Sequence, residues 1–100
     1  MLNINADTNV KIGCYNYDII FVDNNSEDLD YGQNWGVIDN VNLEIKIAQK
    51  LKVEQQEEIF LHEIIHGSLD YMDVEHDEEL VSKLSKVLYQ VLKDNKHFKV

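Results

Sequence analysis

The chain has 100 residues, of which 19 are acidic and 9 are basic, and its formal net charge is -10 at pH 7. A chain of this length buries one modest core, which predicts a single domain over residues 1–100. Every basic residue is a lysine, and the large acidic excess leaves no basic surface for phosphates. We therefore expect no nucleic-acid partner.

The sequence also predicts no membrane association. No apolar run approaches the roughly 20 residues that a membrane span needs. The stretch from Met1 to Asp7 lacks the basic start and the long apolar run of a secretory signal, so we expect a soluble protein of the cytoplasm. Because Cys14 is the only cysteine, the chain forms no internal disulfide, and zinc would have to be held by histidine and carboxylate.

The first half of the chain carries β-branched and aromatic residues in short runs, which predict strands. Two antiparallel strands are expected at residues 10–17 and 17–23. Two more are expected at 36–39 and at 43–47, where apolar and polar residues alternate. The polar residues 24–35 predict a long surface loop that could form a rim facing a substrate.

After Lys50 the spacing of apolar residues becomes helical, which predicts helices over residues 53–71 and 76–94. Acidic residues at the start of the second helix and Lys93 at its end suit the helix dipole. Strands followed by helices indicate an α+β fold, in which both helices pack on one face of a small sheet of three or four mainly antiparallel strands.

The first predicted helix contains the motif H-E-x-x-H, formed by His62, Glu63 and His66. Side chains four positions apart lie one above the other on a helix, so the two imidazoles can bind one metal ion. Glu63 is rotated by about 100° around the axis, where its carboxylate can reach a water on the ion without binding the ion. The alternative is a pair of partly buried histidines on an amphipathic helix, but the apolar neighbours and the helical context favour a metal site.

These residues resemble the gluzincin zinc metallopeptidases, in particular the small stand-alone minigluzincins and the ImmA/IrrE-like peptidases of phages and other mobile elements. The resemblance covers His62 to His66 and His76 to Ser85 and extends loosely to residues 36–47. It implies a minimal zincin-like domain that holds one Zn²⁺ ion.

The resemblance implies that a glutamate of the second helix completes the zinc site. Glu78 fits the family pattern, whereas the helical neighbours of Glu79 direct that side chain toward solvent. Two positions depart from the pattern: Ser82 stands where an Asp or Asn often supports a ligand histidine, and Ser68 stands where an apolar residue is usual. Other acidic residues that could replace Glu78 as the third ligand are Asp70, Asp73, Glu75, Asp77 and Glu79.

The resemblance further implies a metallo-endopeptidase in which Glu63 activates a zinc-bound water that attacks the peptide bond. A peptide or protein substrate would lie extended against the strand edge at 36–39 or at 43–47. Tyr71 or His76, in the connection between the helices, could stabilise the oxyanion of the transition state. A packing or surface role is the alternative for both side chains.

The alternative function is a non-catalytic or latent zinc-binding domain that acts as a regulatory interaction protein of a phage or mobile element. In a small domain the metal can supply much of the folding free energy. The two interpretations differ at Glu63, which a structural metal site does not need. A latent form could arise if His97, on the tail after the second helix, folded back onto the open position of the ion.

Overall fold

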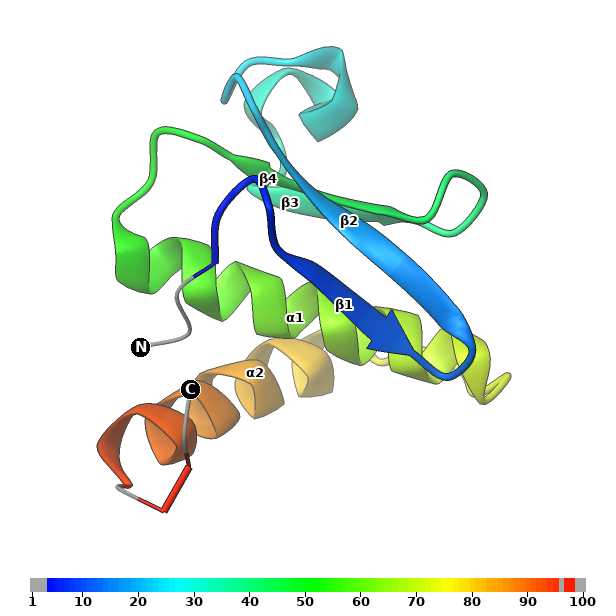
Figure 1. Cartoon of the computed structure of the whole chain (residues 1–100), viewed down its shortest axis with the longest axis vertical. Helices are drawn as coiled ribbons and strands as arrows, with labels where there is room; N and C mark the ends of the chain where they lie inside the picture. Colours follow the sequence, from blue (N-terminus) through cyan, green and yellow to red (C-terminus); the bar gives the residue numbers. More distant parts are fainter. Residues whose placement is uncertain (1–3, 96, 99–100) are drawn as a thin grey trace.

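The computed structural model describes residues 4–95 and 97–98. Their order confirms the predicted α+β class, because a run of strands is followed by two helices (Figure 1). The strands are β1 (Asn9–Ile12), β2 (Tyr15–Val22), β3 (Gly36–Asp39) and β4 (Glu44–Ala48), η1 (Glu27–Gly32) is a 3-10 helix, and the helices are α1 (Val53–Tyr71) and α2 (Glu78–Asp94).

The four strands form one mixed sheet in the order β1-β2-β4-β3. The outer pairs, β1 with β2 and β3 with β4, are antiparallel, whereas β2 and β4 are parallel. The sheet is therefore mainly antiparallel, as predicted. Because β4 is paired on both sides, the outer strands are β1 and β3, each with a free edge as far as residues 4–95 and 97–98 are concerned.

The element boundaries differ from the prediction at three turns. The first strand ends at Ile12, because Gly13 has a φ of 59° and starts the turn into β2. The fourth strand starts at Glu44, because Leu43 has a φ of 56° and closes the preceding turn. The segment predicted as a surface loop contains η1, whose Leu29 is fully buried.

The molecule has three layers, with α1 lying across one face of the sheet and α2 packed on the far side of α1 (Figure 1). The expectation that both helices cover the sheet was wrong for α2. Four strands about 4.8 Å apart make a face about 14 Å wide, most of which one helix of about 10 Å diameter covers. Within the described residues, neither helix combines the length and the apolar character needed to cross a bilayer.

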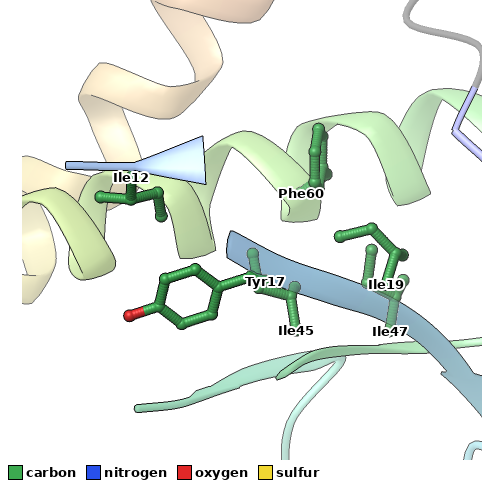
Figure 2. Packing of buried hydrophobic residues seen from close by; sticks show 6 residues of the cluster. All are labelled: Ile12, Tyr17, Ile19, Ile45, Ile47 and Phe60. Atoms are coloured by element: carbon green, nitrogen blue, oxygen red, sulfur yellow. The ribbon is translucent and has the colours of Figure 1, made fainter. Parts of the chain in front are cut away.

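The core lies between the sheet and α1 (Figure 2), and two glycines bring α1 close to the strands. A Cβ on Gly67 would lie 2.7 Å from the side chain of Ile38, and a Cβ on Gly36 would overlap the side chain of Ile59. This close packing places one face of α1 beside the free edge of β3. The buried residues shown in Figure 2 are Ile12, Tyr17, Ile19, Ile45, Ile47 and Phe60.

Candidate metal centre

Helix α1 carries the H-E-x-x-H motif in its middle, where tertiary contacts hold it. The helix begins at Val53, as predicted, and the Lys52 N–H donates to Gln55 Oε1 over 3.0 Å, which satisfies one of the free N–H groups near the helix start. Glu63 is 6% exposed. The side chains of His62 and His66 are each 15% exposed, so the ring of each is mostly held by protein.

A tight turn after α1 reverses the chain toward the histidines. The N–H of Val74 donates to the Leu69 carbonyl over 2.9 Å, and the N–H of Asp73 donates to the Asp70 carbonyl over 3.1 Å. Asp73 has a φ of 57°, and this combination is the Schellman ending of a helix.

Helix α2 starts at Glu78, two residues later than predicted, because Asp77 caps it. The Asp77 side chain accepts a hydrogen bond from the Leu80 N–H over 3.1 Å. The cap fixes Glu78 in the first turn of α2, opposite the two histidines of α1. The turn and the cap therefore direct Glu78 of α2 toward His62 and His66 of α1.

Three side chains converge between α1 and α2 and could hold a metal ion. His62 Nε2 lies 2.9 Å from Glu78 Oε1, His66 Nε2 lies 2.7 Å from Glu78 Oε2, and the two Nε2 atoms are 3.2 Å apart. One ligand atom from each of the three residues lies within 4.8 Å of the others. In a tetrahedral zinc site with ligands at about 2.0 Å, neighbouring ligand atoms are about 3.3 Å apart. The donor set therefore fits a single small cation.

Burial tunes two groups of this site in directions that suit metal chemistry. Burial lowers the pKa of His62, which favours the neutral imidazole that binds metals, although the nearby Glu78 charge acts in the opposite direction. Burial, with a smaller contribution from the Glu78 charge, raises the pKa of Glu63 from 4.5 to about 7. A carboxyl group with a pKa near neutrality is suited to exchange protons at physiological pH.

A cleft of about 450 Å³ opens between this site and strand β3. Sequence reasoning missed one polar contributor to the cleft, Asn34, although the segment before β3 was considered as a substrate rim. The only signal in the sequence was the position of this segment just ahead of a predicted edge strand. The lining residues are Asn34, Gly36, Val37, Ile38, His62, Glu63, His66 and Glu78.

The other acidic candidates for the third ligand have different partners or face solvent. Asp70 contacts His76, Asp77 caps α2, and Glu79 forms an ion pair with Lys83 over 2.8 Å. Asp73 and Glu75 are exposed in the turn. Among the acidic residues considered, Glu78 is the one that meets both histidines.

The two candidates for stabilising an oxyanion do not line the cleft. Tyr71 packs its ring edge-on against Tyr15, with centroids 6.1 Å apart, at the turn between β1 and β2. His76 lies behind His66, with the two Nδ1 atoms 2.6 Å apart, on the side of the ring away from Glu78.

The remaining positions singled out in the sequence lie to the side of the centre. The Ser68 hydroxyl donates to the Ile64 carbonyl of its own helix over 2.8 Å. Ser82 lines a neighbouring cavity of about 290 Å³ together with His62. Helix α2 spans about 24 Å from Glu78 to Asp94 at 1.5 Å per residue, and His97 is exposed beyond that far end.

Comparison of the chain with protein-family models, with curated proteins and with solved structures finds no match. The resemblance to the small gluzincins therefore depends on the residues of the motif and of α2, and the function is inferred from the geometry of the site.

Proposed function

We propose that this protein is a zinc-dependent metallopeptidase that hydrolyses peptide bonds in the cleft between α1 and β3. The observation that carries the proposal is the convergence of two imidazoles and one carboxylate, within 2.7–3.2 Å of one another, beside a buried glutamate. Two histidines and one carboxylate are the donor set of many catalytic zinc sites, which keep one position open.

His62, His66 and Glu78 would hold the zinc ion. When bound, zinc would supply Lewis-acid polarisation of the scissile carbonyl and would lower the pKa of a water molecule. The donor atoms are nitrogen and oxygen. This combination suits zinc, whereas calcium and magnesium prefer shells made of oxygen alone. Cys14 lies at the turn between β1 and β2, and it is not part of this donor set.

Glu63 would act as the proton carrier of the reaction. It lines the same cleft as the three ligands but is not one of them. Its carboxylate would accept a proton from the attacking water and then donate that proton to the leaving amine. The burial that raises its pKa to about 7 supports this role, because the group can both take up and release a proton near neutral pH.

The free edge of β3 is the strand edge best suited to bind an extended peptide. Of the two strands considered, β4 is paired on both sides within the sheet, whereas β3 has an open edge and lines the cleft. Backbone N–H and C=O groups of β3 could pair with the substrate as an added strand. This arrangement would select substrates by their extended main chain.

Asn34 would donate a hydrogen bond to the substrate near the reacting carbonyl. Among the side chains that line the cleft, it is the only one that offers an N–H group without being a proposed zinc ligand. Asn amides serve as oxyanion donors in other hydrolases. Asn34 would therefore fill the role for which the sequence offers Tyr71 or His76.

The test compares wild-type protein with Glu63→Gln and with Glu54→Gln, a matched change at an exposed position of the same helix. Zinc content and the digestion of a peptide library are measured, with and without a chelator. We expect Glu63→Gln to keep zinc and to lose about 10²- to 10⁴-fold in cleavage rate, as for loss of a general base. Glu54→Gln should cleave like the wild type.

Equal cleavage by the Glu63→Gln variant and the wild type would contradict the proposed role of Glu63. Zinc-loaded wild-type protein that cleaves no peptide in the library would contradict the peptidase function and favour a non-catalytic zinc domain.

A further inference from the structure

A chain of hydrogen bonds leads from His66 away from the proposed zinc site and into the core. His66 Nδ1 lies 2.6 Å from His76 Nδ1, and His76 Nε2 lies 2.7 Å from Asp70 Oδ1. Asn40 Nδ2 donates to Asp70 Oδ2 over 2.7 Å, and the Tyr17 hydroxyl donates to Asn40 Oδ1 over 2.7 Å. We refer to these five residues as the relay. They come from β2, the β3–β4 turn, α1 and the α1–α2 connection.

Asp70 sets the direction of every hydrogen bond in the relay. An ionised carboxylate only accepts hydrogen bonds, and its two oxygens are used by His76 and Asn40. His76 must therefore carry its proton on Nε2. A neutral imidazole has one N–H and one acceptor nitrogen, so Nδ1 of His76 is then an acceptor.

His66 must in turn place its proton on Nδ1, because it faces the acceptor Nδ1 of His76. In a neutral His66 ring, Nε2 then carries the lone pair, which is directed at the space shared with His62 and Glu78. Nitrogen binds a metal ion through such a lone pair. If the hydrogen bonds of the relay ran in the opposite direction, His66 would carry its proton on Nε2, and that nitrogen could not bind the ion.

We propose that Asp70 and His76 are positioning residues that hold His66 in the tautomer that binds the metal. The metal-binding part of this inference rests on the proposed function. The rings of His76 and His66 lie edge to edge and nearly in one plane, with centroids 4.9 Å apart and planes 14° apart, and the hydrogen bond between their Nδ1 atoms also limits rotation of the ligand ring. At the other end, Tyr17 is 4% exposed and anchors the relay in the core.

Residues that orient a metal ligand through hydrogen bonds commonly contribute about 10- to 100-fold to metal affinity. In this protein His76 lies between the ligand His66 and the carboxylate of Asp70. The direction of the hydrogen bond between Asp70 and His76 therefore fixes the direction of the hydrogen bond between His76 and His66. This arrangement makes a specific prediction for an isosteric change at Asp70.

The variant Asp70→Asn keeps the shape of the side chain but replaces one acceptor by a donor. Asn40, held by Tyr17, still points its amide group at residue 70, so the new NH₂ group faces His76 Nε2. His76 then takes the opposite tautomer and donates to His66 Nδ1, and His66 carries its proton on Nε2. Asp70→Ala lacks this donor and leaves His76 free to choose its tautomer.

The experiment measures zinc affinity at pH 8 by competition with a chromophoric chelator. We expect Asp70→Asn to weaken binding by about 10- to 100-fold and to weaken it more than Asp70→Ala does. Asp73→Asn removes the same charge from the same turn at an exposed position and should bind zinc like the wild type. If Asp70 only supported the local structure, the isosteric Asn would be milder than Ala, and that order would overturn the inference.

A second measurement tests the relay without any metal. Imidazole ¹⁵N–¹H spectra of the metal-free protein at pH 8 report which nitrogen carries the proton. We expect His76 to be protonated on Nε2 and His66 on Nδ1 in the wild type, with the His76 proton moved to Nδ1 in Asp70→Asn. Nε2 of His66 faces Glu78 Oε2 over 2.7 Å and can hold a second proton while no metal is bound, so Nδ1 of His66 and both nitrogens of His76 are the readout. Unchanged tautomers in the variant would refute the relay. If the wild type bound no zinc, the proposed function would fail, and these spectra would still decide the inference.

Discussion

The two ring nitrogens of His66 face two regions of the molecule that are built in different ways. Nε2 faces His62 and Glu78, which come from α1 itself and from the first turn of the next helix. Nδ1 faces His76 and, through it, Asp70, Asn40 and Tyr17, which the fold collects from a span of more than 50 residues. In the proposed function, the first region would hold the metal ion, and the second region would orient one of its ligands.

The difference teaches how a short chain can build a specific centre. Ligands four residues apart on one helix are placed by helical geometry alone. The orienting groups need the sheet, the β3–β4 turn and the α1–α2 connection to be formed first. Consequently, changes on the Nε2 side should act on metal binding directly, whereas changes on the Nδ1 side should act through the ligand and more weakly.

The largest effect is expected for removal of a ligand. His62→Ala should weaken zinc binding by at least about 100-fold, because one of three protein ligands carries about a third of a binding free energy of roughly 10 kcal/mol. His97→Ala, a histidine change on the exposed tail, is the control. Calorimetric titration of both variants measures the difference. Equal affinities in His62→Ala and the wild type would remove His62 from the site.

The next effect concerns the stability of the metal-free protein. Because the folded-state pKa of Glu63, about 7, lies above its usual 4.5, the folded protein binds more protons than the unfolded chain between these values. The contribution of Glu63 to the free energy of unfolding should therefore fall by about 3 kcal/mol as the pH rises from 4.5 past 7. Glu63→Gln lacks this loss.

Urea denaturation of the wild type and of Glu63→Gln at several pH values measures this fall in the free energy of unfolding. The difference between variant and wild type should grow with pH and level off above about pH 8. A difference that does not change with pH would show that burial of Glu63 leaves its titration unaltered.

A smaller effect is expected where α1 approaches β3. In Gly36→Ala the new methyl group overlaps the side chain of Ile59 and lies 3.6 Å from Glu63 Cγ. Such overpacking commonly lowers the free energy of unfolding by about 1–3 kcal/mol. Gly67→Ala, also crowded but inside a helix, should lose less because alanine favours the helix by about 1 kcal/mol. Thermal unfolding compares the two variants, and the reverse order would contradict the packing described for β3.

The smallest effect is expected at the far end of the relay. Tyr17→Phe removes the hydroxyl that donates to Asn40, which should lower the free energy of unfolding by about 1 kcal/mol. Zinc affinity should change less than in Asp70→Asn, because Asp70 still sets the direction of the bonds to His76. A larger loss of zinc affinity in Tyr17→Phe would mean that the orientation of His66 depends on the core rather than on Asp70.

The parts of the molecule that the sequence predicts well are governed by local rules. Periodicity predicted the ends of both helices and of β3 to within two residues, and the motif predicted that His62 and His66 lie on one face of α1. The choice of Glu78 came from a resemblance, and the geometry agrees with it because Asp77 caps α2 at that point. Helix caps and helix faces are short-range properties.

The parts that could not be predicted depend on contacts between distant segments. The parallel pairing of β2 with β4 leaves β3 as the edge beside the cleft, and no local pattern encodes that order. In the sequence, Asp70 was an alternative third ligand and His76 was a candidate oxyanion stabiliser, and no pattern placed either of them beside the other ring nitrogen of His66. Only the Schellman turn at Asp73 and the placement of Asn40 bring them behind His66.

The position of α2 shows a related limit. Its apolar residues recur at helical spacing and form a stripe, which predicted burial, but Leu80 and Val87 remain 59% and 57% exposed, while Val81 and Ser85 are buried. A stripe that is wider than the contact surface leaves part of it in solvent. Amphipathicity identified the helix, and the width of the partner surface decided which residues are buried.

The most direct test of the account is X-ray absorption at the zinc edge of the purified protein, combined with metal analysis. The account predicts one zinc ion per chain, with two imidazole nitrogens and carboxylate oxygen at about 2.0–2.1 Å. Glu78→Gln should alter this shell, whereas Glu79→Gln should not. A spectrum with sulfur from Cys14, with fewer than two imidazoles, or with no stoichiometric metal would contradict the convergence of His62, His66 and Glu78 on one ion.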